Sequence, residues 1–118
     1  MGPKNTVQIY PGEEVFIEVD QQDGVIEKMT AVKTNNHPEK TFIISLKQVV
    51  KNKACESSML SVKNPFPYKL IYGAMILGLK QKWFETDVYP VEAGLSGYEV
   101  WPNVVVSIGL AKWKFEKS

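Results

Sequence analysis

The sequence predicts an all-β protein that folds as a single antiparallel β-sandwich of about seven or eight strands. Three observations lead to this fold class. Apolar residues recur at every second position over several stretches, which is the side-chain period of a strand with one buried face. Glycine, proline and asparagine separate these stretches at intervals of roughly 8–12 residues, as in sandwiches and barrels. No stretch joins helical periodicity to a clear capping signal, so no helix is expected.

The first third of the chain is expected to hold three strands. A short strand over residues 6–10 is followed by a Pro-Gly turn. Residues 14–20 alternate valine and isoleucine with acidic side chains, which predicts a strand with one wet face. The Asp-Gly pair at 23–24 is favoured in two-residue hairpin turns. Residues 25–34 are therefore expected to pair back on the second strand.

The middle of the chain is expected to hold three further strands. Residues 41–50 are rich in β-branched side chains, and the polar segment 51–57 is expected to be a connecting loop. A strand over residues 60–63 ends at an Asn-Pro pair. Residues 68–79 are apolar on both faces, which indicates a central strand that is covered on each side.

The last third is expected to hold two strands separated by an ordered loop. After a hairpin connection at 80–82, residues 83–89 are expected to form a strand. Residues 90–102 contain two prolines, two glycines and two aromatic residues, a composition typical of a stiffened loop. Residues 104–115 alternate in character and are expected to form the final strand.

The expected core consists of alternating apolar residues from these strands. They are Val15, Ile17, Phe42, Ile44, Leu60, Val62, Tyr72, Ile76, Val106 and Ile108. No linker, internal repeat or low-complexity tract divides the chain. We therefore expect residues 1–118 to form one domain, because a chain of this length can bury a single hydrophobic core.

The segment LSVKNP at residues 60–65 and the apolar stretch that follows it to Ile76 resemble a feature of immunoglobulin-like and fibronectin-like sandwiches. In such domains a strand often ends in Asn-Pro, and a long core strand follows after a short loop. The resemblance implies an immunoglobulin-like architecture of the kind found in uncharacterised bacterial proteins, including exported ones, and it implies no particular function. The antibody-type cysteine pair is absent, because Cys55 is the only cysteine, and no tryptophan precedes Trp83.

Composition and charge narrow the classes of partner. All 14 basic residues are lysines, and the net charge is +1. Arginine supplies most bidentate contacts to phosphate and guanine, and a net charge near zero gives a polyanion little attraction. Nucleic acid is therefore not an expected partner. The alternation of Lys112 and Lys114 with Trp113 and Phe115 is expected to be a terminal strand that buries its aromatic side chains.

Nucleophilic catalysis is not expected. The only histidine, His37, lies in the turn-forming sequence Asn-Asn-His-Pro, and the only cysteine, Cys55, lies in a polar segment. A Cys–His dyad needs a thiol that the imidazole activates and usually a third group that orients the base. Nothing in the sequence supplies that third group. A hydrolase that uses Cys55 remains a less favoured alternative.

Two pairs of carboxylates could in principle support acid–base chemistry. Glu18/Asp20 and Glu85/Asp87 are each spaced by two residues, so each pair shares one face of a strand, about 6–7 Å apart. Glycosidases use two carboxyl groups at similar separations, but solvated strand faces produce the same spacing without any catalytic role. We expect no catalytic residue, no metal site and no cofactor.

The candidate binding surface is the aromatic segment after residue 88. Aromatic faces together with carboxylates and amides can bind sugars or peptide segments, and prolines stiffen the segment so that less entropy is lost on binding. We favour the interpretation that Trp101 and Tyr98 plug one end of the sandwich while the loop crosses between the sheets. The candidate binding residues are Tyr89, Glu92, Tyr98, Glu99, Trp101 and Asn103.

We therefore expect a non-enzymatic binding domain that contacts protein or carbohydrate through the loop 90–103 or through an exposed sheet edge. The alternative is a small closed barrel that holds an apolar small molecule. The uncharged run at residues 70–79 is about half of what a membrane-spanning helix needs. A periplasmic or extracellular location, after removal of a signal peptide, is favoured over a cytoplasmic one, and the oligomeric state is open.

Overall fold

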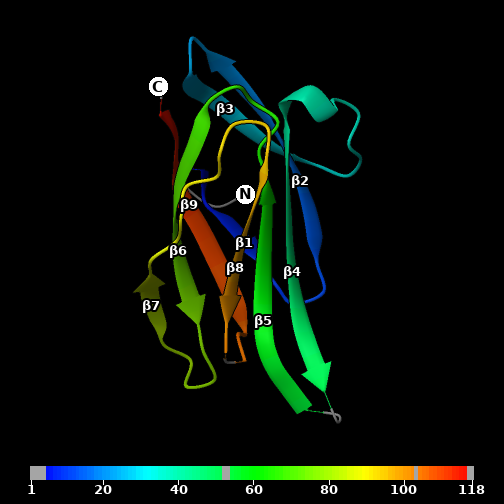
Figure 1. Cartoon of the computed structure of the whole chain (residues 1–118), viewed down its shortest axis with the longest axis vertical. Coiled ribbons are helices and arrows are strands. Elements are labelled where there is room, and N and C mark those ends of the chain that lie inside the picture. The colour runs from blue at the N-terminus through cyan, green and yellow to red at the C-terminus, as the bar shows by residue number, and fades with distance from the viewer. Residues whose placement is uncertain (1–4, 52–53, 103, 117–118) are drawn as a thin grey trace.

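Two antiparallel sheets pack face to face as a sandwich (Figure 1). The computed structural model describes residues 5–51, 54–102 and 104–116. Nine strands lie within these residues, and a short 3₁₀ turn, η2 (Pro38–Lys40), precedes β4 (Thr41–Lys51). The predicted all-β sandwich is confirmed, with one more strand than expected. Because the described strands fall into two separate sheets, they do not close into the single barrel of the alternative expectation.

The four-stranded sheet has the order β1-β9-β6-β7, and the five-stranded sheet has the order β3-β2-β4-β5-β8. The strands of the first are β1 (Val7–Ile9), β6 (Lys69–Leu77), β7 (Trp83–Thr86) and β9 (Ser107–Glu116). Those of the second are β2 (Glu14–Gln22), β3 (Val25–Val32), β4 (Thr41–Lys51), β5 (Ala54–Lys63) and β8 (Ser96–Trp101). All strand pairs within the sheets are antiparallel.

The β2–β3 hairpin has the turn that its Asp-Gly pair predicts. Asp23 and Gly24 have φ angles of 52° and 82°, and two successive left-handed residues are the mark of a type I′ turn. Gln22 pairs with Val25 across the two-residue loop. The side-chain oxygen Oε1 of Gln21 accepts the Gly24 N–H at 2.7 Å. The local sequence therefore determines the conformation of the turn between β2 and β3.

The prediction of a connecting loop at residues 51–57 is wrong, because β4 and β5 form one long hairpin. The ladder continues to the pair Lys51 and Ala54, with a register shift at Val49/Val50. The backbone of Cys55 lies in β5, opposite Val50. Val49 and Val50 are both exposed, so buried and exposed positions do not alternate at these two residues of β4. A stretch of strand without this alternation lacks the pattern on which a sequence-based prediction depends.

Only one face of β6 is covered. Its residues alternate between buried positions such as Tyr72 and Ile76 and partly or fully exposed positions such as Gly73 and Met75. The expectation of a strand covered on both sides is therefore wrong. No further layer of the described chain packs on the outer face of the four-stranded sheet, so its apolar residues meet solvent.

A β-bulge in β9 changes which side chains face the core. Gly73 pairs with Ala111 and Ile71 pairs with Lys114, so two residues of β9, Lys112 and Trp113, lie opposite the single residue Tyr72. Lys112 has a φ of 58°, a left-handed conformation that is unusual for a residue other than glycine. The bulge shifts the alternation by one residue. Ile108 and Leu110 are buried before the bulge, and Trp113 and Phe115 are buried after it.

Most of the predicted core is buried, and one member is not. Val106 is 37% exposed, and Val105 is buried instead. The reason is that β9 begins only at Ser107, so strand alternation does not extend back to residues 104–106. Val15 is partly buried against the core, and the buried members are Ile17, Phe42, Ile44, Leu60, Val62, Tyr72, Ile76 and Ile108. The exposed Lys112 and Lys114 and the buried Trp113 and Phe115 confirm the prediction for the terminal strand.

Candidate functional site

The predicted binding segment contains a strand rather than an extended loop. Its second half forms β8, which pairs with β5 at the edge of the five-stranded sheet. In the pairing, Tyr98 lies opposite Ser61 and Glu99 lies opposite the buried Leu60. Opposed residues share a sheet face, so Tyr98 points outward and Glu99 points toward the core. The two are therefore on opposite faces.

The carboxylate of Glu99 has a structural environment. Its Oε2 atom accepts the backbone N–H of Tyr89 at 2.8 Å. Burial raises the pKa of Tyr72, and the negative charge of Glu99 adds to that increase. The carboxylate of Glu92, another candidate, pairs with Lys69 at 3.6 Å. Glu99 and Glu92 thus have contacts within the fold.

The aromatic candidates also differ from one another. Tyr98 is 61% exposed and Tyr89 is 81% exposed, so neither plugs the sandwich. Trp101 is partly buried against the core, and its indole N–H donates to Oγ1 of Thr86 at 3.2 Å. That bond joins β8 to β7 across the two sheets. Asn103 lies outside the described residues, and a binding role for the six candidates stays a prediction.

A buried valine, Val91, ties the segment before β8 to the four-stranded sheet. Val91 exchanges two backbone hydrogen bonds with Leu70, at 2.8 and 2.9 Å, and its side chain is buried. A β-carbon at Gly97 would lie 2.8 Å from Cγ2 of Val91, which is too close for any real contact. Gly97 in β8 is therefore required for Val91 to pack.

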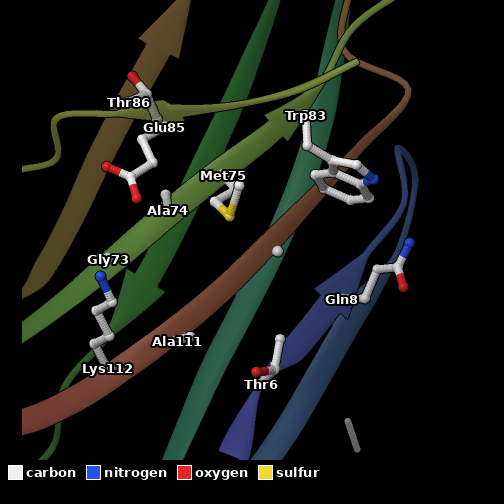
Figure 2. A pocket seen from close by; sticks show the side chains of 11 residues that line it. Thr6, Gln8, Gly73, Ala74, Met75, Trp83, Glu85, Thr86, Ala111 and Lys112 are labelled. Carbon is white, nitrogen blue, oxygen red and sulfur yellow. The ribbon is translucent and has the colours of Figure 1, made fainter. Parts of the chain in front are cut away.

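A concave surface lies on the outer face of the four-stranded sheet, and we refer to it as the sheet groove (Figure 2). It encloses about 400 Å³. Strands β1, β6, β7 and β9 all contribute to it. The lining residues are Thr6, Gln8, Gly73, Ala74, Met75, Trp83, Glu85, Thr86, Gly109, Ala111 and Lys112.

Small residues on neighbouring strands create the depth of the sheet groove. Gly109 of β9 pairs with Gln8 on one side and with Met75 on the other, and Ala111 pairs with Gly73. Glycine and alanine leave the sheet backbone nearly bare at adjacent positions. A β-carbon at Gly109 would meet the Trp83 ring at 3.7 Å, so the indole lies against this bare floor.

Polar and aromatic groups form the walls of the sheet groove. In Figure 2, Trp83 and Gln8 lie toward one end, and Glu85 and Lys112 lie toward the other, with Met75 between them. The Trp83 side chain is partly open to solvent, since the residue is 43% exposed. Within the described part of the chain, neither Glu85 nor Lys112 takes part in an ion pair. Both charges are therefore free to bind another molecule.

The bulge in β9 places Lys112 at the sheet groove. Leu110 faces the core, so regular alternation would point residue 112 inward as well. The left-handed conformation at Lys112 turns its side chain outward, where it packs near Gly73. Bulges commonly re-aim a side chain beside functional sites. Sequence reasoning missed this site, although Gly109 and Ala111 share a face of the predicted last strand.

The carboxylate pair of β2 has a structural partner. Nζ of Lys40 lies 3.1 Å from Asp20 and 4.0 Å from Glu18. Its hydrogen bond to Asp20 is the main reason why the pKa of Lys40 is raised. The other predicted pair is divided, because Glu85 lines the sheet groove and Asp87 does not.

Other chemistry finds little support in residues 5–51, 54–102 and 104–116. They contain no group of three histidine, cysteine, aspartate or glutamate side chains that could hold a metal ion. His37 is exposed and lies 3.7 Å from the carboxylate of Glu39. The side chain of Cys55 falls outside the described atoms. A helix with the length and apolarity to span a bilayer is also lacking in this part of the chain.

Comparison with known protein families, with curated proteins and with solved structures yields no match for this chain. The assignment of function therefore depends on the geometry of the site.

Proposed function

We propose that the protein is a non-catalytic binding domain that recognises carbohydrate through the sheet groove. The observation that carries the proposal is the half-open indole of Trp83, which lies against the glycine floor at Gly109. A flat aromatic surface with free polar groups nearby suits a ligand that has both an apolar face and a polar rim.

A sugar ring has this combination of surfaces. Its C–H groups can stack on the Trp83 ring, while its hydroxyl groups can donate to Glu85 and accept from Lys112. The volume of about 400 Å³ falls within the range typical of small-molecule sites. The groups are mounted on paired strands rather than on loops, so little conformational entropy is lost when a ligand binds.

The same arrangement favours binding over hydrolysis. Glycosidases need two carboxyl groups on opposite sides of the bond that breaks. Among the described lining residues of the sheet groove, Glu85 is the single carboxylate. A sugar held there would meet one acidic group and one cationic group, Lys112, which is a recognition pattern rather than an acid–base pair.

The direct test is a glycan array, followed by calorimetric titration of any oligosaccharide that binds. Trp83→Ala is expected to weaken binding about tenfold or more, because aromatic contacts dominate such sites. Tyr98→Ala is the matched control, since it removes a similarly exposed aromatic residue from the other sheet. Equal affinity of wild type and Trp83→Ala would overturn the proposal. Loss of binding in Tyr98→Ala alone would favour the β8 edge.

A second variant tests the floor of the sheet groove. Gly109→Leu fills the space beneath the indole, and its β-carbon meets the Trp83 ring only at an ordinary contact distance of 3.7 Å. Binding should be lost while the thermal unfolding transition remains cooperative. An unchanged affinity in this variant would exclude the sheet groove as the ligand site.

A further inference from the structure

A second pocket opens at the end of the sandwich that carries the β6–β7 hairpin, and we refer to it as the end pocket. It encloses about 480 Å³ and shares no lining residue with the sheet groove. Its described lining residues are Ile76, Gly78, Leu79, Lys80, Lys82, Phe84, Trp101, Val104 and Val105. Ile76 pairs with Phe84 and is buried in the core, so the end pocket lies on the inner side of the four-stranded sheet.

The apolar part of the end pocket is unusually open. Leu79 is 70% exposed and Phe84 is 51% exposed, although Phe84 is on the inner face of β7. The opposing sheet ends at β8, so the inner face of β7 is left partly uncovered. Clusters of exposed large apolar residues on a small domain commonly mark a binding surface.

The polar part of the end pocket is entirely basic. Lys80 and Lys82 flank Gln81, whose φ of 60° closes the hairpin together with a 3.0 Å hydrogen bond from its N–H to the Gly78 carbonyl. Both lysines are exposed, and within the described part of the chain neither forms an ion pair. No acidic side chain is found among the described lining residues.

Acidic side chains gather at the opposite end of the molecule, together with Lys28 and with Lys40, which is hydrogen-bonded to Asp20. The β2–β3 hairpin, at the top of Figure 1, carries Asp20, Asp23 and Glu27, whereas the β6–β7 hairpin lies at the bottom. The longest dimension of the molecule is 46 Å, several times the screening length of about 8 Å at physiological salt. An anion that approaches the end pocket therefore meets the lysines and little of the distant acidic charge.

We propose that the end pocket binds a single acyl chain that has an anionic head group. The apolar lining takes the methylene groups, and the two ammonium groups of Lys80 and Lys82 take the negative charge. This ligand class matches both halves of the site, because an uncharged hydrocarbon would leave the lysines unused and a small inorganic anion would leave Leu79 and Phe84 uncovered. The proposal is independent of carbohydrate binding at the sheet groove.

The first experiment titrates the protein with dodecanoate, decanoate and octanoate below their micelle concentrations, using calorimetry. One molecule should bind, and affinity should fall about fourfold for each methylene removed, or about fifteenfold from one acid to the next in this series. Affinities that are independent of chain length would overturn the proposal.

The charge reversals Lys80→Glu and Lys82→Glu, combined in one variant, should weaken dodecanoate binding about tenfold or more. The matched control combines Lys28→Glu and Lys33→Glu, which reverse two exposed lysines on and beside β3 and should leave the affinity unchanged. If both double variants bind equally well, the lysines of the end pocket do not hold the head group and the proposal is wrong.

Gly78→Leu blocks the end pocket without a change of charge. A β-carbon at Gly78 would meet only the Phe84 ring, at 3.7 Å, so the variant should fold and should bind no dodecanoate. Gly109→Leu, which fills the sheet groove instead, should bind dodecanoate as the wild type does. If Gly78→Leu instead bound dodecanoate and Gly109→Leu did not, the acyl chain would lie in the sheet groove, and the proposal for the end pocket would be wrong.

Vesicle sedimentation distinguishes the two sources of such a chain. Binding of monomeric dodecanoate without binding to phosphatidylglycerol vesicles assigns a free fatty acid. Binding to phosphatidylglycerol vesicles, but not to phosphatidylcholine vesicles, assigns an anionic membrane lipid, provided that Gly78→Leu abolishes it. The absence of binding to both probes, with a cooperatively folded protein, would overturn the proposal.

Discussion

The two faces of the four-stranded sheet use the same strands for different purposes. On the inner face, the rings of Tyr72 and Trp113 stack with centroids 5.2 Å apart, and Phe42 of the other sheet covers Trp113 at 5.6 Å. On the outer face, Gly109 leaves the backbone bare beneath Trp83, and Gly73 leaves it bare beside Lys112. Large side chains at adjacent positions fill a core, whereas small ones at adjacent positions leave a groove.

A single bulge connects these two faces. The left-handed residue Lys112 lets Trp113 turn inward and sends the lysine itself outward to the sheet groove. The core and the proposed binding site thus depend on the same irregularity in β9. The comparison predicts that substitutions on the inner face change stability and that those on the outer face change binding.

Trp113→Ala should have the largest effect on stability, a loss of about 3–5 kcal/mol in the free energy of unfolding. The indole is buried between two rings, and its N–H donates to the Asn5 carbonyl at 3.0 Å. Urea denaturation followed by circular dichroism measures the loss. A loss below about 1 kcal/mol would show that the inner face does not depend on this ring.

Tyr72→Phe should change the pH dependence of stability. Burial raises the pKa of Tyr72 in the folded state, while in the unfolded chain a tyrosine ionises near pH 10. Below about pH 10 the Tyr72 hydroxyl is protonated in both the folded and the unfolded state, so its ionisation does not affect the free energy of unfolding there. At higher pH the unfolded state loses the proton first, and stability falls by about 1.4 kcal/mol per pH unit.

The Tyr72→Phe variant lacks this proton, so its stability should decline less steeply above about pH 10 than that of the wild type. Denaturant midpoints of both proteins between pH 8 and pH 11.5 provide the measurement. The lysines that also titrate in this range are common to both proteins, so they cancel in the comparison. If the denaturant midpoints of the two proteins fell equally with pH, the raised pKa of Tyr72 would be contradicted.

Trp83→Ala should change stability by about 1 kcal/mol or less, because its ring is partly solvated and lies on the outer face. The same denaturation experiment that measures Trp113→Ala measures this variant. A loss as large as that of Trp113→Ala would mean that Trp83 is a core residue and would remove the contrast between the two faces.

Lys112→Gly should have the smallest effect, a gain of about 0.5 kcal/mol. Glycine adopts the left-handed conformation without the cost of about 1–2 kcal/mol that a residue with a β-carbon bears, and its greater freedom in the unfolded chain offsets part of the gain. Lys112→Met is the control, since it removes the charge and keeps the backbone strain. Both variants should bind a ligand of the sheet groove more weakly.

Much of the fold could be predicted from local patterns. Alternation identified the strands around Ile17, Phe42 and Val62, because each has one buried face and one wet face. The Asp-Gly pair identified the β2–β3 turn, because few other residues tolerate two successive left-handed conformations. The immunoglobulin-like resemblance stays a prediction.

The candidate site could be predicted only in part. The sequence pointed to aromatic residues beside carboxylates, but it placed them in the segment that contains Tyr98 and Trp101. The residues of the sheet groove come from four strands that are distant in the sequence, such as Gln8, Trp83 and Lys112. Their proximity depends on strand order, and no pattern within one strand reports which strands are neighbours.

The sequence by itself determined that this chain forms an all-β sandwich with an aromatic and aliphatic core, because strand period and turn residues act over a few neighbouring positions. Only the tertiary structure decided where β8 pairs, where β9 changes phase and which glycine lies beneath Trp83. Those outcomes depend on long-range pairing. A bulge or an added edge strand becomes favourable only when the partner strand and the opposing sheet are in place.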